Sequence, residues 1–408
     1  MLHLSLNARV VSATSIPPVL DEMRRTGATE HGVQRMITKG GFLAIALEHV
    51  SRVQANLLKQ EMLAAGGDAA VSRGICSEEA SETGVLLVGS RRQFTDLISR
   101  LAEEPFDLPE VAREIDRALG AYGRRQFVLR MGSREITLGP RPALVGVVNV
   151  TPDSFSDGGK VLDPKAAVAH GEELAAEGAD ILDVGGESTR PGAEPVGAGE
   201  ELARVIPVIR GLAAAVKTPL GIDTRHACVA REAVAAGACL VNDVTGLTGD
   251  PEMARAVAET RAGLVVMHIQ GDPRTMQQDP VYDNMMADIC RFLRRSIVAA
   301  REAGVPEDHI FVDPGIGFGK RLQHNLQILA RLGQLRTLGR PIMVGPSRKR
   351  FIGEVTGIEA PAERLFGTAA ACAMAVAQGA LALRVHDVLQ MRQAVAVAAA
   401  IAEDGETG

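Results

Sequence analysis

The sequence predicts an α/β protein whose larger part is a (β/α)8 TIM barrel. Eight short apolar runs follow Ala143 at fairly regular intervals, and helical patterns separate them. Each run is apolar at consecutive positions, as expected of a parallel strand that is covered on both faces. Eight such β/α units in about 260 residues match the size of a barrel. A doubly wound open sheet shows the same alternation and is the structural alternative.

The eight expected strands come first in each unit. They are Leu144–Val150, Ile181–Val184, Leu220–Asp223, Leu240–Asp243, Leu264–Met267, Ile310–Asp313, Ile342–Val344 and Leu381–Val385. The helices expected between and after them are Pro164–Glu177, Glu200–Val216, Ala227–Ala236, Pro251–Thr260, Met285–Ala303, Leu322–Leu332, Arg350–Thr356 with Pro361–Gln378, and Val388–Ala402.

A β-hairpin is expected directly before the barrel. Gln126–Arg130 and Glu135–Leu138 flank the turn Met131–Ser133, and such a hairpin could plug the amino-terminal end of the barrel. We therefore place a domain boundary between residues 122 and 123, based on this change in pattern. Residues 123–408 form the barrel domain in this interpretation.

Residues 1–122 are expected to form a small α+β domain. A helix is predicted over His49–Ala65, with apolar residues at Val50, Val53 and Leu57 and a stop at Gly66 and Gly67. A strand is expected at Val85–Val88, followed by helices at Phe94–Ala102 and Pro109–Leu119. Asp68 and Arg73 are interpreted as turn and surface residues. The domain shows no catalytic constellation, and its role stays open.

Composition excludes several classes of function. The 408 residues carry a net charge of −6, which gives no support to a nucleic-acid or anionic-membrane partner. Aromatic residues make up 3% and Trp is absent, so stacking platforms for single-stranded nucleic acid are not expected. The five cysteines contain no C-x-x-C pair, and no secretory or membrane-spanning pattern is seen, so we expect a cytoplasmic protein.

Polar residues collect where the predicted strands end, which is where barrel enzymes carry their chemistry. Any one of them could simply cap the next helix. Together they put acidic or amide groups after strands 1, 2, 3, 4 and 6 and cations after strands 7 and 8. So much converging charge at one mouth is hard to tolerate without a ligand. The residues are Asn149, Asp183, Asp223, Asn242, Asp313, Ser347, Arg348, Lys349, Arg350, Arg384 and His386.

This set divides into two chemistries. Asp223, Asn242 and Asp313, with Lys349, suit a flat heterocycle that presents adjacent N–H donors and a carbonyl, because a carboxylate accepts two parallel N–H bonds. The remaining neutral or cationic groups suit phosphate oxygens. They are Asn149, Ser188, Thr189, Arg190, Arg384 and His386. If the phosphate leaves, a divalent cation would help, and an oxygen ligand such as Asn149 suits Mg²⁺.

Five motifs carry a resemblance to a known family. They are NVTPDSFSDGG at 149–159, GGESTRPGA at 185–193, DPGIGFGK at 313–320, SRK at 347–349 and RVHD at 384–387. Together, in this order and at this spacing, they resemble the dihydropteroate synthases. The resemblance spans residues 126–402. It implies a transferase of folate biosynthesis, which condenses (7,8-dihydropterin-6-yl)methyl diphosphate with 4-aminobenzoate to give 7,8-dihydropteroate and diphosphate.

The resemblance also implies roles for particular residues. The pterin would be held by Asp223, Asn242, Met267, Asp313 and Lys349. The diphosphate would be held by Asn149, Thr189, Arg190, Arg384 and His386, with Asn149 on Mg²⁺. The aminobenzoate would be held by Phe155, Pro191, Phe318 and Ser347, with Arg350 as a further candidate. Catalysis would rest on Asn149, Arg190, Lys349, Arg384 and His386.

A dissociative, SN1-like route fits these residues, and the family is thought to use it. Mg²⁺, Arg190, Arg384 and His386 would stabilise the departing diphosphate, and Asp223 with Asp313 would favour the cation left on the pterin methylene. The arylamine attacks with its own lone pair, so no dedicated base is assigned. His268 is interpreted as a structural histidine. Closure of loops 151–159 and 187–193 would exclude water. Sulfonamides, which imitate 4-aminobenzoate, are expected to compete with it.

Two residues depart from the family pattern. Arg350 stands where members often carry Ser close to the aminobenzoate carboxylate, and Ile316 replaces a common aromatic residue. The segment at 55–74 is similar to an extension of some longer members, for which a structural or oligomerisation role is the default. The resemblance also implies a homodimer through helices near the carboxyl terminus.

Two other functions are alternatives. A pterin-binding methyltransferase would share the pterin set but would not need Thr189, Arg190, Arg384, His386 or the 347–349 loop. A non-catalytic pterin-binding protein would be expected to have lost a loop or an anion ligand. Neither alternative explains the complete set of motifs.

Overall fold

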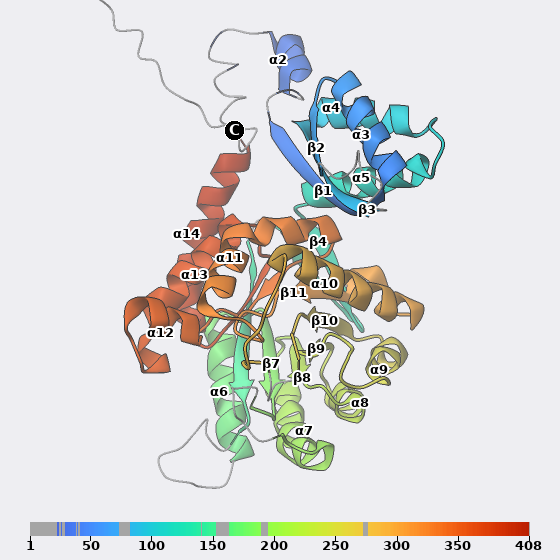
Figure 1. Ribbon diagram of the computed structural model, residues 1–408. Coiled ribbons are helices and arrows are strands. Elements are labelled where there is room, and N and C mark those ends of the chain that lie inside the picture. The colour runs from blue at the N-terminus through green and yellow to red at the C-terminus, as the bar shows by residue number, and fades with distance from the viewer. Residues whose placement is uncertain are drawn as a thin grey trace, which may run out of the picture. The chain divides into compact units, whose positions relative to one another are not determined.

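The structure is a computed structural model that describes residues 29–37, 41–72, 82–139, 141–151, 163–188, 195–271 and 276–407, together with Met23, Thr26 and Lys39. The chain divides into two compact units (Figure 1). The first comprises Met1–Gly120 with Ala402–Gly408, and the second comprises Ala121–Ile401. Each unit is described by itself below.

The first unit has the expected α+β composition. Its sheet has the order β1-β3-β2, and β3 runs antiparallel to both neighbours. Apolar side chains from the sheet and from three helices form its core. The strands are β1 (Phe42–Ser51), β2 (Asp68–Val71) and β3 (Glu82–Ser90), and the helices are α2 (Glu30–Ile37), α3 (Arg52–Ala64), α4 (Arg91–Leu101) and α5 (Leu108–Gly123).

Two strands of this unit were missed, and one helix begins later than predicted. Residues 49–51 end β1, and α3 begins only at Arg52, because Ser51 and Gln54 form a capping box there. The periodicity that starts at Val50 therefore mixed a strand residue with helix residues. Val53 is 45% exposed, and the buried stripe of α3 is Ala55, Leu58 and Met62. Asp68, expected in a turn, begins β2.

The second unit is the predicted barrel. Its eight parallel strands have the order β11-β10-β9-β8-β7-β6-β13-β12, and a parallel bridge between Val312 and Ile342 joins the two ends. The expected strand positions are confirmed to within one residue at each end. The strands are β6 (Ala143–Asn149), β7 (Ile181–Gly185), β8 (Leu220–Asp223), β9 (Leu240–Asp243), β10 (Gly263–Met267), β11 (Ile310–Asp313), β12 (Met343–Val344) and β13 (Ala382–Val385).

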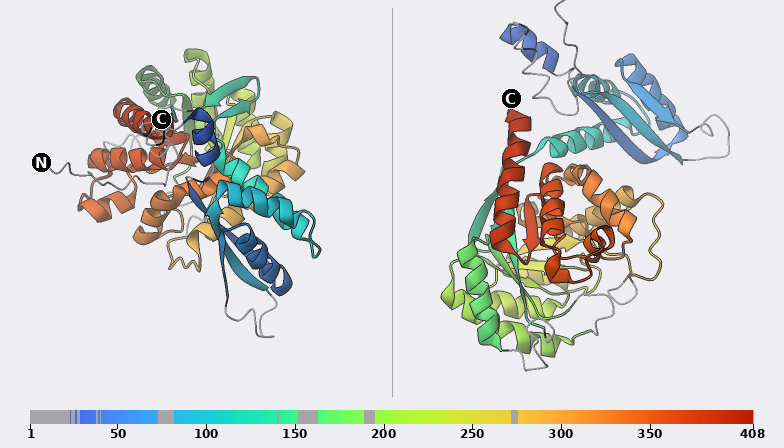
Figure 2. Two further views of the ribbon diagram at one scale, coloured as in Figure 1. Left: turned by 90° about the horizontal axis from the view of Figure 1, so that it is seen from above. Right: turned by 90° about the vertical axis from the view of Figure 1, so that its left-hand side faces the viewer.

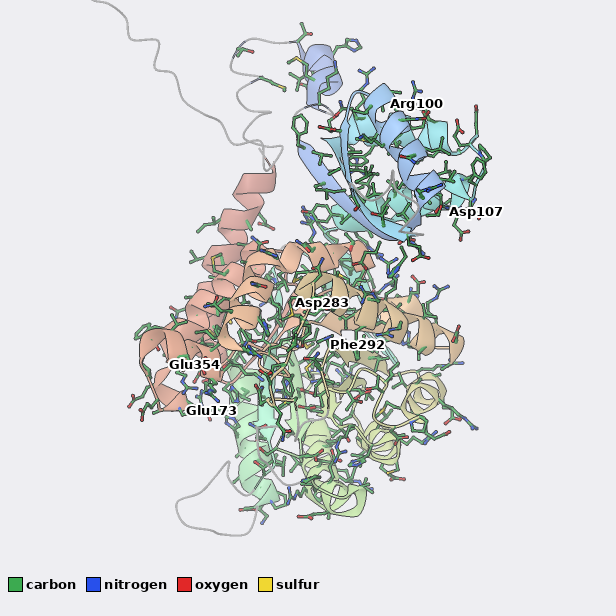
Figure 3. The ribbon with its side chains drawn as sticks, viewed as in Figure 1. Arg100, Asp107, Glu173, Asp283, Phe292 and Glu354 are labelled. Atoms are coloured by element: carbon green, nitrogen blue, oxygen red, sulfur yellow. The ribbon has the colours of Figure 1, made fainter. Side chains whose placement is uncertain are left out.

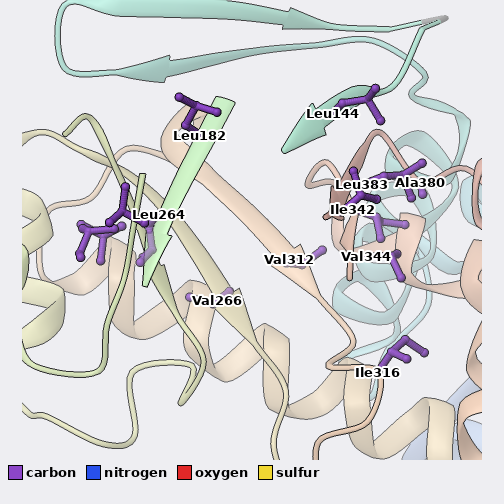
Figure 4. Close-up of a cluster of buried hydrophobic side chains, with 14 of the residues drawn as sticks. Leu144, Leu182, Leu264, Val266, Val312, Ile316, Ile342, Val344, Ala380 and Leu383 are labelled. Atoms are coloured by element: carbon purple, nitrogen blue, oxygen red, sulfur yellow. The ribbon is translucent and has the colours of Figure 1, made fainter. Parts of the chain in front are cut away.

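Helices cover the outside of this sheet (Figure 2). They are α6 (Pro164–Glu177), α7 (Ala198–Ala215), α8 (Ala227–Ala236), α9 (Met253–Thr260), α10 (Met285–Glu302), α11 (Leu322–Arg331), α12 (Arg350–Thr356), α13 (Leu365–Ala377) and α14 (Val388–Thr407). The largest apolar cluster lies between strands and helices, and Figure 4 shows part of it, with Leu182, Leu264 and Val312 on different strands. Charged residues such as Glu173 on α6 and Glu354 on α12 belong to the outer helices (Figure 3).

The predicted hairpin plug is present. β4 (Phe127–Met131) pairs antiparallel with β5 (Arg134–Leu138). Its apolar side chains, including Leu129 and Met131, share a buried cluster with side chains from the strands of the barrel, among them Val265 and Phe311. The cluster closes the amino-terminal end of the barrel interior, so the polar strand ends lie at the opposite end. No helix in the described ranges is both long enough and apolar enough to span a bilayer.

Candidate active site

The strand register brings the polar strand ends into one row. Asn149 of β6 is paired with Gly185 of β7, Gly185 with Asp223 of β8, and Asp223 with Asn242 of β9. Because the strands are parallel, these residues share one level at the carboxyl end of the sheet. Gly185 has no side chain, so it leaves room between the side chains of Asn149 and Asp223.

A cavity opens at this end of the barrel and collects most of the predicted site. Its lining also includes three apolar or small residues, Val244, Ile316 and Gly345. The predicted residues that line it are Asp223, Asn242, Met267, Asp313, Phe318, Ser347, Lys349, Arg384 and His386. Residues from the five strands β8, β9, β10, β11 and β13, and from the segments that follow β9, β11, β12 and β13, therefore meet in a single site.

The two carboxylates of the cavity lie in a poorly solvated place. Burial raises the pKa of Asp223 to about 7, although the nearby Arg384 guanidinium opposes the shift. Burial likewise raises the pKa of Asp313 to about 6, and a hydrogen bond of 2.6 Å from the Gly315 amide to its Oδ1 works against that shift. A ligand that brings N–H donors or positive charge would therefore stabilise the ionised form of both carboxyl groups.

Arg384 is held between two carboxylates. Its Nε donates to Asp183 Oδ2 at 2.6 Å, and its Nη2 donates to Asp223 Oδ2 at 2.8 Å. Asp183 Oδ2 also accepts from Asn242 Nδ2 at 3.0 Å. Burial alone would lower the pKa of Arg384, but the two aspartates raise it above its ordinary value. The guanidinium is thus permanently charged and fixed in orientation.

Lys349 faces the aromatic wall of the cavity. It stands at the residue before α12, and its ammonium lies 4.2 Å from the centroid of the Phe318 ring. Burial, with the charge of Arg384, lowers the pKa of Lys349 to about 8, against the attraction of Asp313 and Asp223. The cation and the ring form a surface against which a flat ligand can pack.

The loop after β11 is held by a buried lysine. Lys320 Nζ donates to the carbonyl oxygens of Phe318 at 2.7 Å and His268 at 3.2 Å, and lies 3.0 Å from His268 Nδ1. Gly315 has φ of +69°, and a Cβ there would lie 2.0 Å from the His268 carbonyl oxygen, so only glycine fits. Burial and the charge of Lys320 lower the pKa of His268 to about 2, so this histidine stays neutral. It does not line the cavity, which fits its interpretation as structural.

The motifs after the last two strands are joined to each other. Ser347 Oγ lies 3.0 Å from His386 Nδ1 and accepts from the His386 amide at 3.3 Å. Arg348 forms two hydrogen bonds with the Asp387 carboxylate, at 3.1 and 2.5 Å. The loop that carries Lys349 and the strand end that carries Arg384 are therefore fixed relative to one another.

Some predicted residues are not brought to the cavity. The Arg350 side chain is 82% exposed and pairs with Glu354 at 2.7 Å, so the structure does not bring it to the cavity lining. Asn149 ends its strand in the same row as Asp223 but is not part of the cavity lining. Phe155, Thr189, Arg190 and Pro191 lie outside the described residues.

Two further residues of the site received no role from the sequence. Asp183 organises Arg384 and Asn242, and Lys320 holds the loop that carries Phe318. Asp183 did leave a signal, because it is the single charged residue in the otherwise apolar run ILDVG. Lys320 ends the DPGIGFGK motif, but burial of a lysine could not be read from that position alone.

Comparison with known proteins places this barrel in a family. The profile of the family described as "Pterin binding enzyme" matches residues 145–386. A dihydropteroate synthase of Synechocystis sp. is 43% identical over 273 residues, which cover 67% of this chain and 94% of that protein. The chain belongs to the dihydropteroate synthase family. The family's first and last matched strands are β6 and β13, so the match contains the complete cavity.

A longer relative extends over both units. A probable bifunctional folylpolyglutamate synthase/dihydropteroate synthase of Halobacterium salinarum is 39% identical over 389 residues, or 95% of this chain. This chain spans 46% of the length of that relative. Most of residues 1–122 thus have a counterpart in that relative.

Solved structures of the family match the barrel. The dihydropteroate synthase of Xanthomonas albilineans with 4-aminobenzoic acid aligns with a TM-score of 0.64 at 49% identity, over 68% of this chain and 98% of that chain. The same enzyme in complex with 7,8-dihydropteroate aligns with a TM-score of 0.61 at 47% identity, over 67% and 98%. The Yersinia pestis enzyme with a sulfonamide drug complex aligns with a TM-score of 0.64 at 41% identity, over 68% and 100%.

Proposed function

We propose that this chain is a dihydropteroate synthase that joins (7,8-dihydropterin-6-yl)methyl diphosphate to 4-aminobenzoate, with 7,8-dihydropteroate and diphosphate as products. The observation that carries this proposal is the single cavity in which Asp223, Asn242, Asp313, Lys349 and Arg384 meet. A transferase of folate biosynthesis is what the family membership indicates.

The pterin would occupy the deep, acidic part of the cavity. Asp223 and Asp313 are buried acceptors, and a pterin presents N–H donors along one edge that two carboxylates can pair. Asn242 and Lys349 also line the cavity, and Met267 adds an apolar contact surface. A buried carboxylate has lost its hydration, so hydrogen bonds from the pterin would stabilise it strongly. This stabilisation would compensate for the burial of the two carboxylates.

The diphosphate would lie beside Arg384 and His386. Nη1 of Arg384 has no hydrogen-bond partner among the residues that the structure describes, so it can donate to a phosphate oxygen. Thr189 and Arg190 complete this set in the proposal. Both follow Glu187, whose carboxylate is held by two hydrogen bonds from Arg225, at 2.9 and 3.0 Å.

A magnesium ion fits the donors that are present. Within the described ranges, no group of three or more His, Cys, Asp or Glu residues could hold a metal. Mg²⁺ commonly takes one or two protein oxygens and completes its shell with substrate phosphates and water. Asn149 offers such an oxygen at the end of β6, beside the side-chain-free Gly185. When bound, the ion would supply charge neutralisation to the departing diphosphate.

The reaction would follow a dissociative, SN1-like route. The bond between the methylene carbon and the diphosphate oxygen breaks, and the electron pair leaves with diphosphate toward Arg190, Arg384 and His386. The positive charge that remains is delocalised into the dihydropterin ring, near Asp223 and Asp313. The amine of 4-aminobenzoate then forms the carbon–nitrogen bond with its lone pair and afterwards releases a proton, so no strong base is needed.

The arylamine would pack against Phe318, with Phe155 and Pro191 as further walls. Phe318 lies in a buried apolar cluster with Met267 and Met276, and its ring is held beneath Lys349. Ser347 also lines the cavity. Arg350 is exposed and engaged by Glu354, so its contact with the aminobenzoate carboxylate would require a different side-chain orientation. Sulfonamides would compete for this part of the site.

We also propose a homodimer that uses the outer faces of α13 and α14. These helices follow the paired strands β12 and β13, so they are neighbours on the outside of the barrel (Figure 1). Phe366 and Met374 are 86% and 52% exposed on one face of α13. Val397 and Ile401 are 62% and 69% exposed on one face of α14. Large exposed apolar residues on neighbouring helices are typical of an interface.

A cytoplasmic location is proposed on the cysteines. Cys228, Cys239, Cys290 and Cys372, the cysteines that the structure describes, form no disulfide with one another, which suits a reducing compartment.

The reaction itself tests the proposed function. The purified chain would be incubated with the dihydropterin methyl diphosphate, 4-aminobenzoate and Mg²⁺, while diphosphate release and dihydropteroate are measured. We expect diphosphate release that depends on the arylamine and is inhibited competitively by a sulfonamide. Binding of the pterin without turnover would instead support a non-catalytic pterin-binding protein.

A further inference from the structure

Asp183 is a deeply buried charged residue that contacts the cavity lining, and the proposed mechanism gives it no part. Its side chain is 1% exposed. It lies two residues below the end of β7, and does not itself line the cavity. Its Oδ2 accepts from Nε of Arg384 at 2.6 Å and from Nδ2 of Asn242 at 3.0 Å. One oxygen therefore links a residue of the diphosphate set to a residue of the pterin set.

The barrel makes room for this carboxylate at a specific place. Asp183 is paired in register with Gly221 of β8, and a Cβ at residue 221 would lie 2.8 Å from Asp183 Oδ1. That Oδ1 has no hydrogen-bond partner in the described structure. A buried carboxylate oxygen without a hydrogen bond lowers the stability of the folded state. Such a residue is expected where its other oxygen contributes to a functional site.

We propose that Asp183 is a positioning residue. It determines which group of the Asn242 amide faces the pterin, and it helps to fix the orientation of the Arg384 guanidinium for the diphosphate. This assignment rests on the proposed function, because it concerns how the same cavity distinguishes pterin from diphosphate. Asp183 touches neither half of the substrate and acts through its two partners.

The effect on Asn242 follows from the chemistry of the two side chains. An ionised carboxylate can only accept hydrogen bonds, so Asn242 must turn its NH2 group toward Asp183. The amide oxygen of Asn242 is then left to face the cavity as an acceptor. A ring N–H is recognised at that position, and a ring acceptor is disfavoured. Without the carboxylate, the amide could rotate and present either group.

The effect on Arg384 is one of orientation and charge. Two carboxylates that bind different nitrogens, Nε and Nη2, fix the plane of the guanidinium. Asp183 also adds a second negative charge beside Arg384, so that Asp223 is not its only counter-charge. Asp223 can then exchange part of its pairing with Arg384 for N–H donors of the pterin, while Arg384 stays in place for the diphosphate.

The test measures binding of each half of the substrate separately. Asp183→Asn keeps the shape but removes the charge and the obligatory acceptor. We expect the dissociation constant for 7,8-dihydropterin, measured by calorimetry, to rise by about tenfold or more, as for loss of a hydrogen bond to a charged group. Affinity for inorganic diphosphate should fall by a smaller factor, because the bond from Nε of Arg384 is weakened while Asp223 still holds its Nη2.

Two other variants separate positioning from general damage. Gly221→Ala keeps the charge but drives a Cβ toward Asp183 Oδ1, so it should weaken pterin binding in the same direction. Asp243→Asn is the matched control: Asp243 is also buried at a strand end, but its oxygens accept from Thr245 and Leu247 and it does not line the cavity. That control should leave both affinities unchanged. Circular dichroism would confirm that each variant is folded.

Two outcomes would overturn the assignment. One is pterin affinity of Asp183→Asn and Gly221→Ala equal to that of the unaltered chain. The other is a parallel loss of pterin and diphosphate affinity that Asp243→Asn reproduces, which would indicate a merely structural carboxylate. If the unaltered chain bound neither ligand, the proposed function would fail, and this assignment would fail with it. Should Asp183→Asn not fold, Gly221→Ala decides the question alone.

Discussion

The two units of this chain bury very different kinds of side chain. In the described residues of the first unit, the core consists of apolar residues such as Leu58, Leu87 and Phe94, and the buried polar residue is Ser90, which caps α4. The barrel has a larger apolar core and also buries charged and polar groups. These include Asp183, Glu201, Asn242, Asp243, His268, Asp313 and Lys320.

This difference distinguishes residues that stabilise the fold from residues that serve the chemistry. A buried charge loses its hydration, and an ion pair or hydrogen bond offsets that loss only in part. A unit whose only task is to fold has no reason to carry such groups. The barrel keeps them at the carboxyl ends of its strands, where Asp223, Asp313, Lys349 and Arg384 line one cavity. We therefore assign the chemistry to the barrel and expect substitutions in the two units to have unequal consequences.

The largest effect is expected for Arg384→Ala. The change leaves Asp183 and Asp223 as buried carboxylates without their common partner, which costs about 3–5 kcal/mol of unfolding free energy. It also removes a donor to the diphosphate, so kcat/KM should fall by at least about 100-fold. Denaturant unfolding and steady-state kinetics measure the two effects. Arg255→Ala, at a 69% exposed side chain on α9, is the control and should change neither.

A smaller effect is expected for Asp223→Asn. An amide cannot accept two parallel N–H bonds, so pterin affinity should fall by about 10- to 100-fold, the usual range for hydrogen bonds to a charged group. Calorimetry with 7,8-dihydropterin measures the change. Asp180→Asn, which removes a carboxylate that pairs with Arg141 just before β7, should leave the affinity intact. Equal affinities for both variants and the unaltered chain would remove Asp223 from the pterin site.

The pH dependence of kcat/KM should reveal the buried charges of the barrel directly. The pKa values of Asp313 and Asp223 are raised to about 6 and about 7, and that of Lys349 is lowered to about 8. Since both carboxylates must be ionised and the lysine protonated, kcat/KM should rise as pH increases through 6 to 7 and fall above 8. In Asp223→Asn the rise near pH 7 should disappear. These groups titrate between about pH 5 and 9. If kcat/KM did not change over that range, the proposed pairing of these groups with substrate would be contradicted.

The smallest effect on activity is expected from the core of the first unit. Phe94→Ala removes a fully buried ring and should cost about 3–5 kcal/mol of stability, yet leave kcat/KM unchanged. Phe311→Ala is the matched change in the barrel, in the layer where the hairpin meets the strands. It should lower both stability and kcat/KM. Loss of catalysis in Phe94→Ala would mean that the first unit contributes to the reaction.

Periodicity made the barrel predictable and the first unit only partly so. Buried parallel strands are apolar at every position, and Ala-rich helices separate them, so strands such as Leu220–Asp223 and helices such as Pro164–Glu177 were located from the sequence to the residue. The long edge strand β1 was missed because its outer face is exposed and polar residues interrupt it near His49. After His49, the last apolar residue of the strand, Val50, has helical spacing with Val53 and Leu57, so it was assigned to the helix that follows.

The sequence alone determined that acidic, amide and cationic groups follow the strands of a barrel. These residue types, with the order of the motifs, predicted a planar substrate that carries phosphate. Only the tertiary structure decided which of them pair. Asp183 and Arg384 are separated by 201 positions, and their contact exists because β7 and β13 both flank β6 in the closed sheet. Sequence patterns report burial and periodicity along the chain, whereas the distance between two charges, and therefore their pKa values and their roles, depends on how the strands are arranged in space.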